Sequence, residues 1–260
     1  MKAVFFISMC CLMCLTGNLY GAGISSDFDI TIHPEHISID AGFNGTAVTI
    51  TGQIPSNADA LIRITGKPEH SRLKQKGRVL GILWMNLGSV EVANVPDLFL
   101  LYLPEETEGV SWSNQPVLRN LGLGLEGVRK QAEISGGDNN KDALFDEFVK
   151  LKQKSGRYAV LDNSVHYGQN DGKMKSFTAT LPLPSTLPEG TYQLETFVIE
   201  DGAVTASATR EIDAGEVGLP SWISTLAFDH GTLYGVLAVL VALMAGLLTG
   251  ILFKGEKGAH

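Results

Sequence analysis

Two histidines near the start of the chain are the first residues whose types could do chemistry. His33 and His36 flank Pro34 and Glu35 in the segment ITIHPEHISID, residues 30–40. Together with His70 or His166 they could form a nitrogen and oxygen site for a metal ion. On a continuous strand, however, positions 33 and 36 point to opposite faces, and proline excludes a helix that would align them. Only a turn at Pro34 would bring them together, so the spacing permits a metal site without indicating one, and we predict none.

A run of alternating cations is the most unusual polar feature of the sequence. Arg72, Lys74, Lys76 and Arg78 stand two residues apart in SRLKQKGRV, so on a strand all four point to one face. The chain has a formal net charge of −8, and this stripe therefore concentrates positive potential. Three interpretations stay open: a solvated edge strand that discourages strand pairing, attraction to anionic lipid headgroups, and capture of a small anion or an acidic partner. No aromatic residues interleave the charges for stacking, which argues against nucleic acid as the partner.

Motifs for catalysis or for cofactor binding are weak. GLGLEG, residues 122–127, has the dinucleotide spacing G-x-G-x-x-G, but NQPVLRN precedes it in place of the buried strand that this motif requires. The sequence contains no G-x-S-x-G elbow, and no spacing of serine, histidine and aspartate selects a triad. We therefore expect a protein that is not an enzyme and has no cofactor.

The N-terminal segment determines the compartment of these residues. In MKAVFFISMCCLMCLTGNLYGAG a lysine is followed by an apolar run and then by small residues, which predicts a secretory signal peptide over residues 1–23. All three cysteines, Cys10, Cys11 and Cys14, fall inside this segment. A mature chain would therefore contain neither disulfides nor thiolate metal sites.

The C-terminal segment predicts a membrane anchor. The 21 residues from Leu233 to Phe253 carry no charge. A helix of this length is long enough to cross a hydrocarbon core of about 30 Å. We expect a transmembrane helix over residues 228–253 and a tail over residues 254–260. Lys254 and Lys257 follow the span, whereas Asp213, Glu216 and Asp229 precede it. The positive-inside rule then places the tail in the cytoplasm and the main domain in the periplasm, with a single pass through the inner membrane.

Two further features of this anchor concern what it contacts. Trp222, Phe228 and Tyr234 are suited, as aromatic anchors, to the interface on the outer side of the membrane that the helix crosses. Small residues recur at every fourth position of the span, at Ala238, Ala242, Gly246 and Gly250. This spacing forms one flat stripe that lets another helix approach closely. Self-association and docking to another membrane protein are both open.

Residues 24–227, between the two ends, are predicted to form a mainly β domain. Apolar and polar residues alternate from Phe28 to Ile64 and again in TYQLETFVIE, and Asp201-Gly202 supplies a tight hairpin turn. Pro34 sits where the alternation changes register, so we expect a first strand kinked at its middle. GRVLGILWMN, SVEVANV and DLFLLYLP are interpreted as further strands of one sandwich half. The pattern favours an immunoglobulin-like β-sandwich, with two small β domains joined by helices as the alternative.

The middle of the domain changes to a helical pattern, which predicts a helical insertion at about residues 114–156. Leucines 118, 121 and 125 recur at helical spacing, although three glycines weaken this segment. KDALFDEFVKLKQKSG is a stronger helix, with Leu144, Phe148 and Leu151 on one face. An Asn or Asp can cap its start and Gly156 can end it.

Five segments occur in an order that resembles a known family. They are FNGTAVTITG, KGRVLGILWMN with SVEVANVPDLFLLY, LFDEFVKLKQKSGRY, LPEGTYQLETFVIEDGAV and LYGVLAVLVALMAGLLTGILFK. The chain is similar to a family of predicted membrane-anchored periplasmic proteins first described from alphaproteobacteria, and the resemblance covers nearly all of the mature chain. Members are often encoded beside permeases of the sulfite-exporter type. The resemblance therefore implies an accessory role near an anion transporter, and it implies no activity and no catalytic residues.

We accordingly predict a non-enzymatic, membrane-anchored periplasmic protein that acts as an accessory or interaction partner of a sulfite-exporter-type permease. Its partners would be the lipid bilayer and either a permease or a second copy of the chain, and not nucleic acid. One alternative is a periplasmic module that binds a metal or senses a ligand. Another is a module for cell-envelope adhesion or assembly, which a β-sandwich permits equally.

Overall fold

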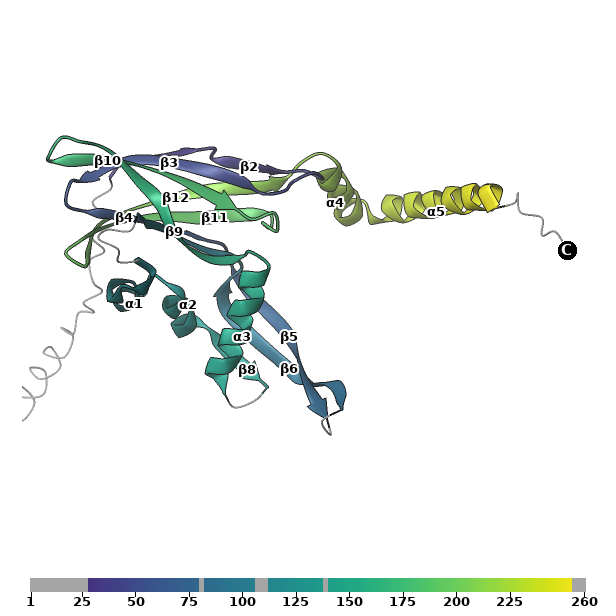
Figure 1. The fold of residues 1–260 in the computed structure, drawn as a ribbon. Helices are drawn as coiled ribbons and strands as arrows, with labels where there is room; N and C mark the ends of the chain where they lie inside the picture. The colour runs from purple at the N-terminus through teal and green to yellow at the C-terminus, as the bar shows by residue number, and fades with distance from the viewer. Residues whose placement is uncertain (1–27, 80–81, 106–111, 138–139, 254–260) are drawn as a thin grey trace, which may run out of the picture.

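The computed structural model describes residues 28–79, 82–105, 112–137 and 140–253. The predicted signal peptide and the predicted tail lie outside these residues. Within them the chain is mainly β, as expected, and ends in one long apolar helix (Figure 1). The strands are β1 (Ile30–His33), β2 (His36–Ile39), β3 (Thr46–Pro55), β4 (Asp59–Thr65), β5 (Pro68–Val79), β6 (Leu83–Pro96), β7 (Phe99–Pro104), β8 (Glu133–Gly136), β9 (Tyr158–Asn170), β10 (Met174–Leu183), β11 (Gly190–Glu200) and β12 (Ala203–Glu216).

The strands of the described residues form two sheets. The larger has nine strands in the order β1-β3-β10-β9-β7-β4-β11-β12-β2, and the smaller has three in the order β5-β6-β8. Together they make the sandwich-like arrangement that the alternation predicted. The immunoglobulin-like variant of this fold stays a prediction.

The segment predicted as one kinked first strand shows how the large sheet closes. It splits at Pro34, as expected, into β1, which pairs antiparallel with β3, and β2, which pairs in parallel with β12. These are the two opposite edges of the nine-stranded order, yet only Pro34 and Glu35 separate β1 from β2. Because two residues cannot cross a flat sheet of nine strands, the sheet must curve round until its edges approach each other. The kinked strand thereby encloses a core.

Two hydrophobic cores lie on the two faces of this curved sheet. The inner core contains Ile50, Ile62 and Leu100, whereas the outer core contains Leu61 and Leu101 from the same strands. Successive residues of a strand point to opposite faces, so β4 and β7 contribute to both cores. Every residue of β7 is buried for this reason. The helices and the small sheet supply the other wall of the outer core.

The predicted helical insertion is confirmed and contains α1 (Pro116–Leu121), α2 (Leu125–Gln131) and α3 (Lys141–Lys154). The Oδ1 atom of Asn140 caps α3 by accepting a hydrogen bond from the amide of Ala143 at 3.1 Å, and Gly156 follows its end with a φ of 74°. One detail differs: β8 interrupts the insertion and pairs with β6. The buried face of α3 also differs from the predicted one, because Leu151 is exposed and Lys152 is buried instead.

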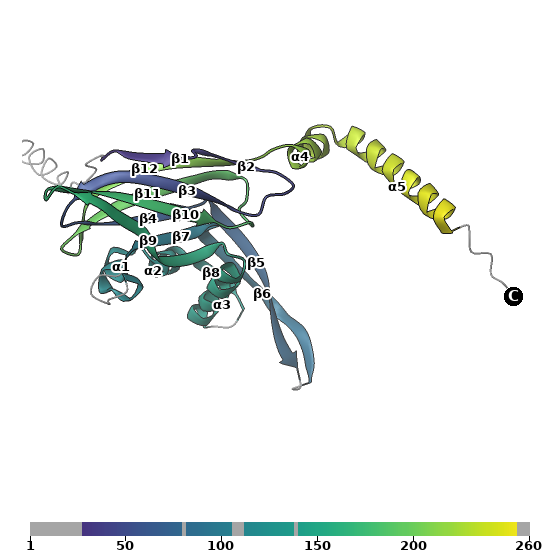
Figure 2. The ribbon, with the colours of Figure 1, turned by 45° about the horizontal axis from the view of Figure 1, so that its top comes forward.

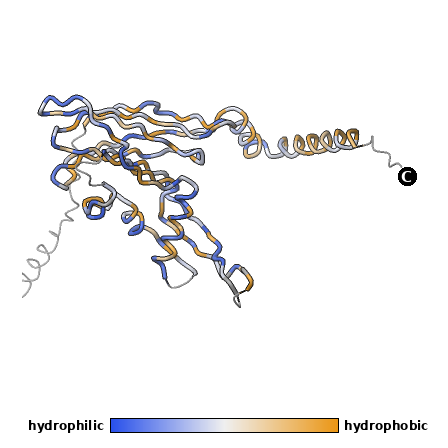
Figure 3. The backbone as a smooth tube through the Cα atoms, viewed as in Figure 1, coloured by the Kyte–Doolittle hydropathy of each residue, from blue (hydrophilic) through white to orange (hydrophobic). Residues whose placement is uncertain are grey.

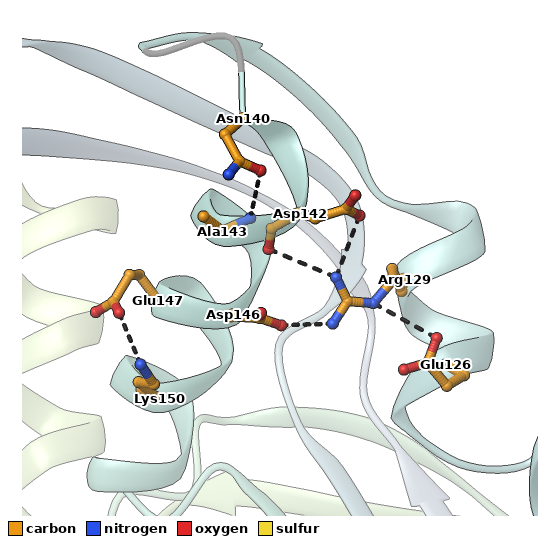
Figure 4. Close-up of polar contacts among 8 residues, drawn as sticks. All are labelled: Glu126, Arg129, Asn140, Asp142, Ala143, Asp146, Glu147 and Lys150. Atoms are coloured by element: carbon orange, nitrogen blue, oxygen red, sulfur yellow. Dashed lines mark hydrogen bonds and ion pairs between the residues drawn. The ribbon is translucent and has the colours of Figure 1, made fainter.

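A charged cluster joins α2 to α3 across the insertion (Figure 4). The guanidinium group of Arg129 on α2 lies 3.4 Å from Asp142 and also pairs with Asp146, both on α3, and lies 3.5 Å from Glu126 on its own helix. It stacks at 4.6 Å from the centre of the Phe145 ring. The hydrogen bond that Arg129 donates to Asp146, together with the surrounding carboxylates, raises the pKa of Arg129 above its ordinary value. The cluster therefore fixes the angle between two short helices.

The hairpin formed by β5 and β6 is where the fold departs from expectation. Its strands were assigned to the sandwich half, but they belong to the separate small sheet and project from the body of the molecule (Figures 1 and 2). Val90 and Val92 bury the stem of the hairpin in the outer core, and β8 pairs with β6 beside them. The far half of the hairpin extends beyond this support.

The chain ends in α4 (Leu219–Asp229) and α5 (Gly231–Phe253). Helix α5 is the only helix among the described residues that is long and apolar enough to cross a membrane, and none of its side chains is buried. It extends away from the sandwich in both views (Figures 1 and 2). The predicted C-terminal transmembrane helix thus agrees with an apolar helix that the domain leaves uncovered.

Candidate functional site

The cationic stripe lies on β5, at the edge of the small sheet. Arg72, Lys74 and Lys76 all point to solvent, while Leu73 and Gln75 between them are partly buried. The strand alternation therefore places the three cations on one face, as predicted. Arg78 also belongs to β5, but its side chain lies outside the described part of the structure. The register shifts between Gln75 and Lys76, at a β-bulge.

The cations of the stripe differ in how far they are neutralised. The Nε atom of Arg72 lies 3.6 Å from Glu91, which also has His70 at 3.8 Å. For Lys74 and Lys76, no carboxylate of the described residues lies within ion-pair distance. The stripe therefore keeps an uncompensated positive charge in a chain whose net charge is −8.

A shallow hollow of about 530 Å³ opens on this stripe. It is lined by Arg72 and Lys74 on β5 and by Asn86, Gly88 and Ser89 on β6. Two cations, an amide and a hydroxyl are the donors that bind phosphate-like oxygen atoms. The hollow is therefore suited to an oxyanion, whether free or part of a larger surface.

The tip of the same hairpin is apolar and was not recognised from the sequence. Ile82 is 83% exposed, Leu83 60% and Met85 52%. In Figure 3 a hydrophobic stretch marks the end of the hairpin, well away from the body of the molecule. The apolar run GILWM was the available signal, but it was interpreted as part of a strand of the sandwich.

The stem of the hairpin is fixed by a buried ion pair. Lys152 of α3 donates a hydrogen bond to the carboxylate of Glu69 on β5, and its ammonium group lies 5.5 Å from the Phe148 ring centre and 5.8 Å from that of Tyr158. Burial raises the pKa of Glu69, but the hydrogen bonds from Lys152 and Ser71 outweigh this effect, so the net pKa is lowered. The hairpin is thus a rigid projection at its base.

A second hollow lies between the large sheet and α2. This cleft has a volume of about 600 Å³, and its polar lining includes Arg63, Lys67, Asn94 and Glu195. Arg63 is already engaged, since its Nη2 atom lies 2.8 Å from Glu195 and its guanidinium lies 5.1 Å from the centre of the Phe197 ring. Lys67 is exposed at the rim. The cleft can accept a small polar ligand.

The four histidines considered for a metal site lie on four different strands. His33 is on β1, His36 on β2, His70 on β5 and His166 on β9. His70 faces Glu91, and His166 contacts Glu105. Within the described ranges, no group of three or more histidine, cysteine, aspartate or glutamate residues is close enough to hold a metal ion.

The glycines of GLGLEG shape a corner between two helices. Gly122 ends α1 with a φ of 65°, and Gly124 precedes the first residue of α2. A Cβ atom on Gly127 would lie 2.0 Å from the carbonyl oxygen of Gly122. The spacing therefore serves a close backbone approach within the insertion, and no strand leads into it as a dinucleotide site requires.

The small residues of the anchor form one stripe on α5. Ala238, Ala242, Gly246 and Gly250 are all exposed, and they recur at a spacing that places them along one side of the helix. The sandwich does not cover this stripe, since α5 has no buried residue. It is available to a second helix.

Comparison with known proteins gives one match. The family model described as "Putative transmembrane protein (Alph_Pro_TM)" matches residues 27–255. Neither the curated proteins nor the solved structures contain a match to this chain. The family match spans the β-sandwich, the hairpin and α5 together. The chain therefore belongs to this family of transmembrane proteins.

Proposed function

We propose that the protein is a non-enzymatic accessory subunit, anchored by α5 in the inner membrane with its β-sandwich in the periplasm. The observation that carries this proposal is α5 itself, a helix of 23 residues without a buried side chain. A helix that is apolar on all sides is stable only where lipid or another apolar helix covers it. Its covering must therefore come from the bilayer, from a partner helix within it, or from both.

The charges on either side of α5 support the orientation. Lys254 and Lys257 follow the helix, whereas Asp229 precedes it and Asp213 and Glu216 stand farther upstream. Cationic residues favour the cytoplasmic side of a span. Helix α4 supports the same arrangement, because Trp222 and Phe228 are 55% and 87% exposed and suit the interface between lipid and water.

The partner that we propose is a permease of the sulfite-exporter type. The small-residue stripe of α5 allows close contact with a helix of such a protein. The family resemblance supports this class of partner, because relatives are often encoded beside these permeases. A sandwich held above the transporter would then act as an interaction module on its outer side.

Purification of the full-length tagged chain in a mild detergent, followed by mass spectrometry, tests this proposal. We expect a permease to co-purify in amounts comparable to the chain. Recovery of the chain with no membrane transporter would overturn the partner assignment. Protease treatment of sealed spheroplasts checks the orientation separately. If the sandwich lies in the periplasm, protease added from outside should cleave it.

Ligand sensing is a second candidate function, favoured by the cleft between the large sheet and α2. Its volume of about 600 Å³ lies within the range of small-molecule sites. Calorimetry with sulfite on the full-length chain in detergent tests it, with Lys67→Gln as the cleft variant. Binding that weakens in this variant supports sensing, and no heat of binding in the unmodified chain rules out sulfite as the ligand.

A further inference from the structure

The β5–β6 hairpin combines three features that have a common explanation. Its tip exposes Ile82, Leu83 and Met85, its edge strand exposes three cations, and its stem is fixed to α3 by the ion pair of Glu69 and Lys152. An exposed apolar tip is unfavourable in water, and a soluble surface rarely groups such residues without a partner. In the structure the tip projects away from the body of the molecule, so these apolar residues stay uncovered (Figures 1 and 2).

We propose that this hairpin is a second membrane contact, which docks on the anionic lipid surface of the bilayer that α5 crosses. The tip residues enter the interfacial region, and Arg72, Lys74 and Lys76 bind headgroup phosphates. This proposal needs α5 to span a bilayer, but it needs no permease and no small ligand.

The charge distribution matches such a surface. Between Pro68 and Pro96 the sequence has four cations and two carboxylates, and one of these carboxylates, Glu69, is already paired with Lys152. Among the described residues, only Glu91 lies within ion-pair distance of the stripe, where it faces Arg72. Long cationic side chains attract anionic headgroups while apolar neighbours enter the interface. The rest of the chain is strongly acidic, so this hairpin is the part that an anionic surface attracts.

The hollow on the stripe gives the headgroup a specific place. Its donors are the side chains of Arg72, Lys74, Asn86 and Ser89, with Gly88 leaving the floor open. No atom lies within 4 Å of the position that a Cβ on Gly88 would take. A phosphate of a lipid headgroup can therefore reach both cations at once.

The placement of the hairpin relative to the anchor agrees with simultaneous contact. In Figure 2 both α5 and the hairpin run downward and to the right from the sandwich. In Figure 1 the hairpin is directed downward and to the right below the sandwich, while α5 extends to the right. Because the anchor confines the domain to the membrane surface, the tip docks in a unimolecular step that loses little translational freedom.

Lipid contact can be measured at the tip with a fluorescent label. The full-length chain with Cys10, Cys11 and Cys14 replaced by serine receives Met85→Cys, which is labelled with an environment-sensitive dye and reconstituted in vesicles. Matched vesicles contain brominated lipids that quench the dye, with or without an anionic phospholipid. The control label is Thr178→Cys, an exposed position on β10 away from the hairpin (Figure 1).

We expect strong quenching at position 85 in anionic vesicles and little at position 178. Replacing Arg72, Lys74 and Lys76 together by glutamine should lower the docking equilibrium constant on the order of 100-fold, since each cation near an anionic surface contributes about 1 kcal/mol. Because all three side chains are exposed, the thermal unfolding of this variant should stay unchanged. Ile82→Ser with Leu83→Ser keeps the charges and should weaken quenching through the tip alone.

Two results would overturn the proposal. The first is equal quenching at positions 85 and 178 in anionic vesicles, which is also the result expected if a membrane protein and not lipid covers the hairpin. The second is quenching at position 85 that is the same with and without anionic lipid, which would remove the role of the cations. These vesicles contain no permease, so failure here is distinguishable from failure of the co-purification experiment.

Discussion

At the scale of single residues, the contacts of Gly127 explain the glycine spacing of GLGLEG. Its position next to the carbonyl oxygen of Gly122 leaves no room for a side chain, because a Cβ atom would approach that oxygen to 2.0 Å. Contacts of this length force the backbone to shift. The glycine spacing therefore reports a tight corner between α1 and α2.

Gly127→Ala should consequently lower the free energy of unfolding by about 1–3 kcal/mol, the usual cost of forcing extra atoms into a packed site. Gly124→Ala is the matched control, since no atom lies within 4 Å of its Cβ position and its φ is −88°. That change should cost less than about 1 kcal/mol, because Gly124 precedes a helix without a side-chain cap. Urea unfolding in detergent measures both, and equal losses would contradict the steric explanation.

Lys152 is the charged residue on which the stem of the hairpin depends. Its side chain is 10% exposed and that of Glu69 is 20% exposed, so the pair is largely removed from water. Lys152→Ala would leave the carboxylate of Glu69 without its cation and should cost about 3 kcal/mol. Lys150→Ala removes the same charge from the same helix, but its pair with Glu147 is exposed, so its loss should change the free energy of unfolding very little. Similar losses in the two variants would show that the pair with Glu69 contributes little.

The ion pair of Glu69 and Lys152 also makes the free energy of unfolding depend on pH. The pKa of Glu69 is lowered from 4.5 in the folded chain, so the folded state favours the carboxylate. A lowered folded pKa contributes stability that is present above pH 4.5 and is lost as the pH falls through the folded value. The difference in unfolding free energy between the unmodified chain and Glu69→Gln should therefore be constant near neutral pH and shrink in acid. Urea titrations across this range test the sign, and a difference that grows in acid would reverse the assignment.

At the scale of elements, Arg129 couples α2 to α3, two helices too short to be stable alone. Arg129→Gln removes its pairs with Asp142 and Asp146 and its stacking on Phe145. The expected loss is about 1 kcal/mol, because the carboxylates are exposed and the stacked ring adds to a weak surface pair. Lys130→Gln is the neighbouring control and should have almost no effect. Hydrogen exchange of α2 amides should accelerate only in the Arg129 variant, and equal rates would refute the coupling.

Local pattern predicted the elements better than it predicted their partners. The alternation from Phe28 to Ile64 and the kink at Pro34 identified strands correctly, because period-two burial and proline act within a few residues. The hairpin was assigned to the wrong sheet, since alternation says that β5 is a strand and not which strand it pairs with. The four-residue strand β8 was missed because its pairing with β6 is set by tertiary contacts alone.

For the candidate sites, too, the features set by local pattern were predicted and those set by tertiary contacts were not. The common face of Arg72, Lys74 and Lys76 follows from strand geometry and was predicted. The exposed tip was not, because an apolar run looks the same whether it is buried or projects. Lys152 was missed although it stands four residues after Phe148 on the apolar face, and that spacing was the one available signal.

At the scale of the whole molecule, the two proposals give the chain two surfaces for the membrane. Helix α5 leaves the sandwich directly after α4, and the hairpin leaves it from the small sheet (Figure 1). A single helix alone permits the domain to tilt and rotate above the bilayer. A second contact through the hairpin would restrict that motion and hold one face of the sandwich toward a partner.

The stripe on α5 leads to the prediction that tests the partner most directly. Gly246→Ile places a branched side chain in the middle of the stripe and should separate two closely packed helices. Met244→Phe enlarges a residue on the opposite side of the helix and is the matched control. We expect the amount of co-purifying permease to fall by about tenfold in the Gly246 variant, equivalent to about 1.4 kcal/mol of association energy, and to stay unchanged in the control. A loss of chain self-association in the Gly246 variant, with permease recovery intact, would instead assign the stripe to a second copy of this protein.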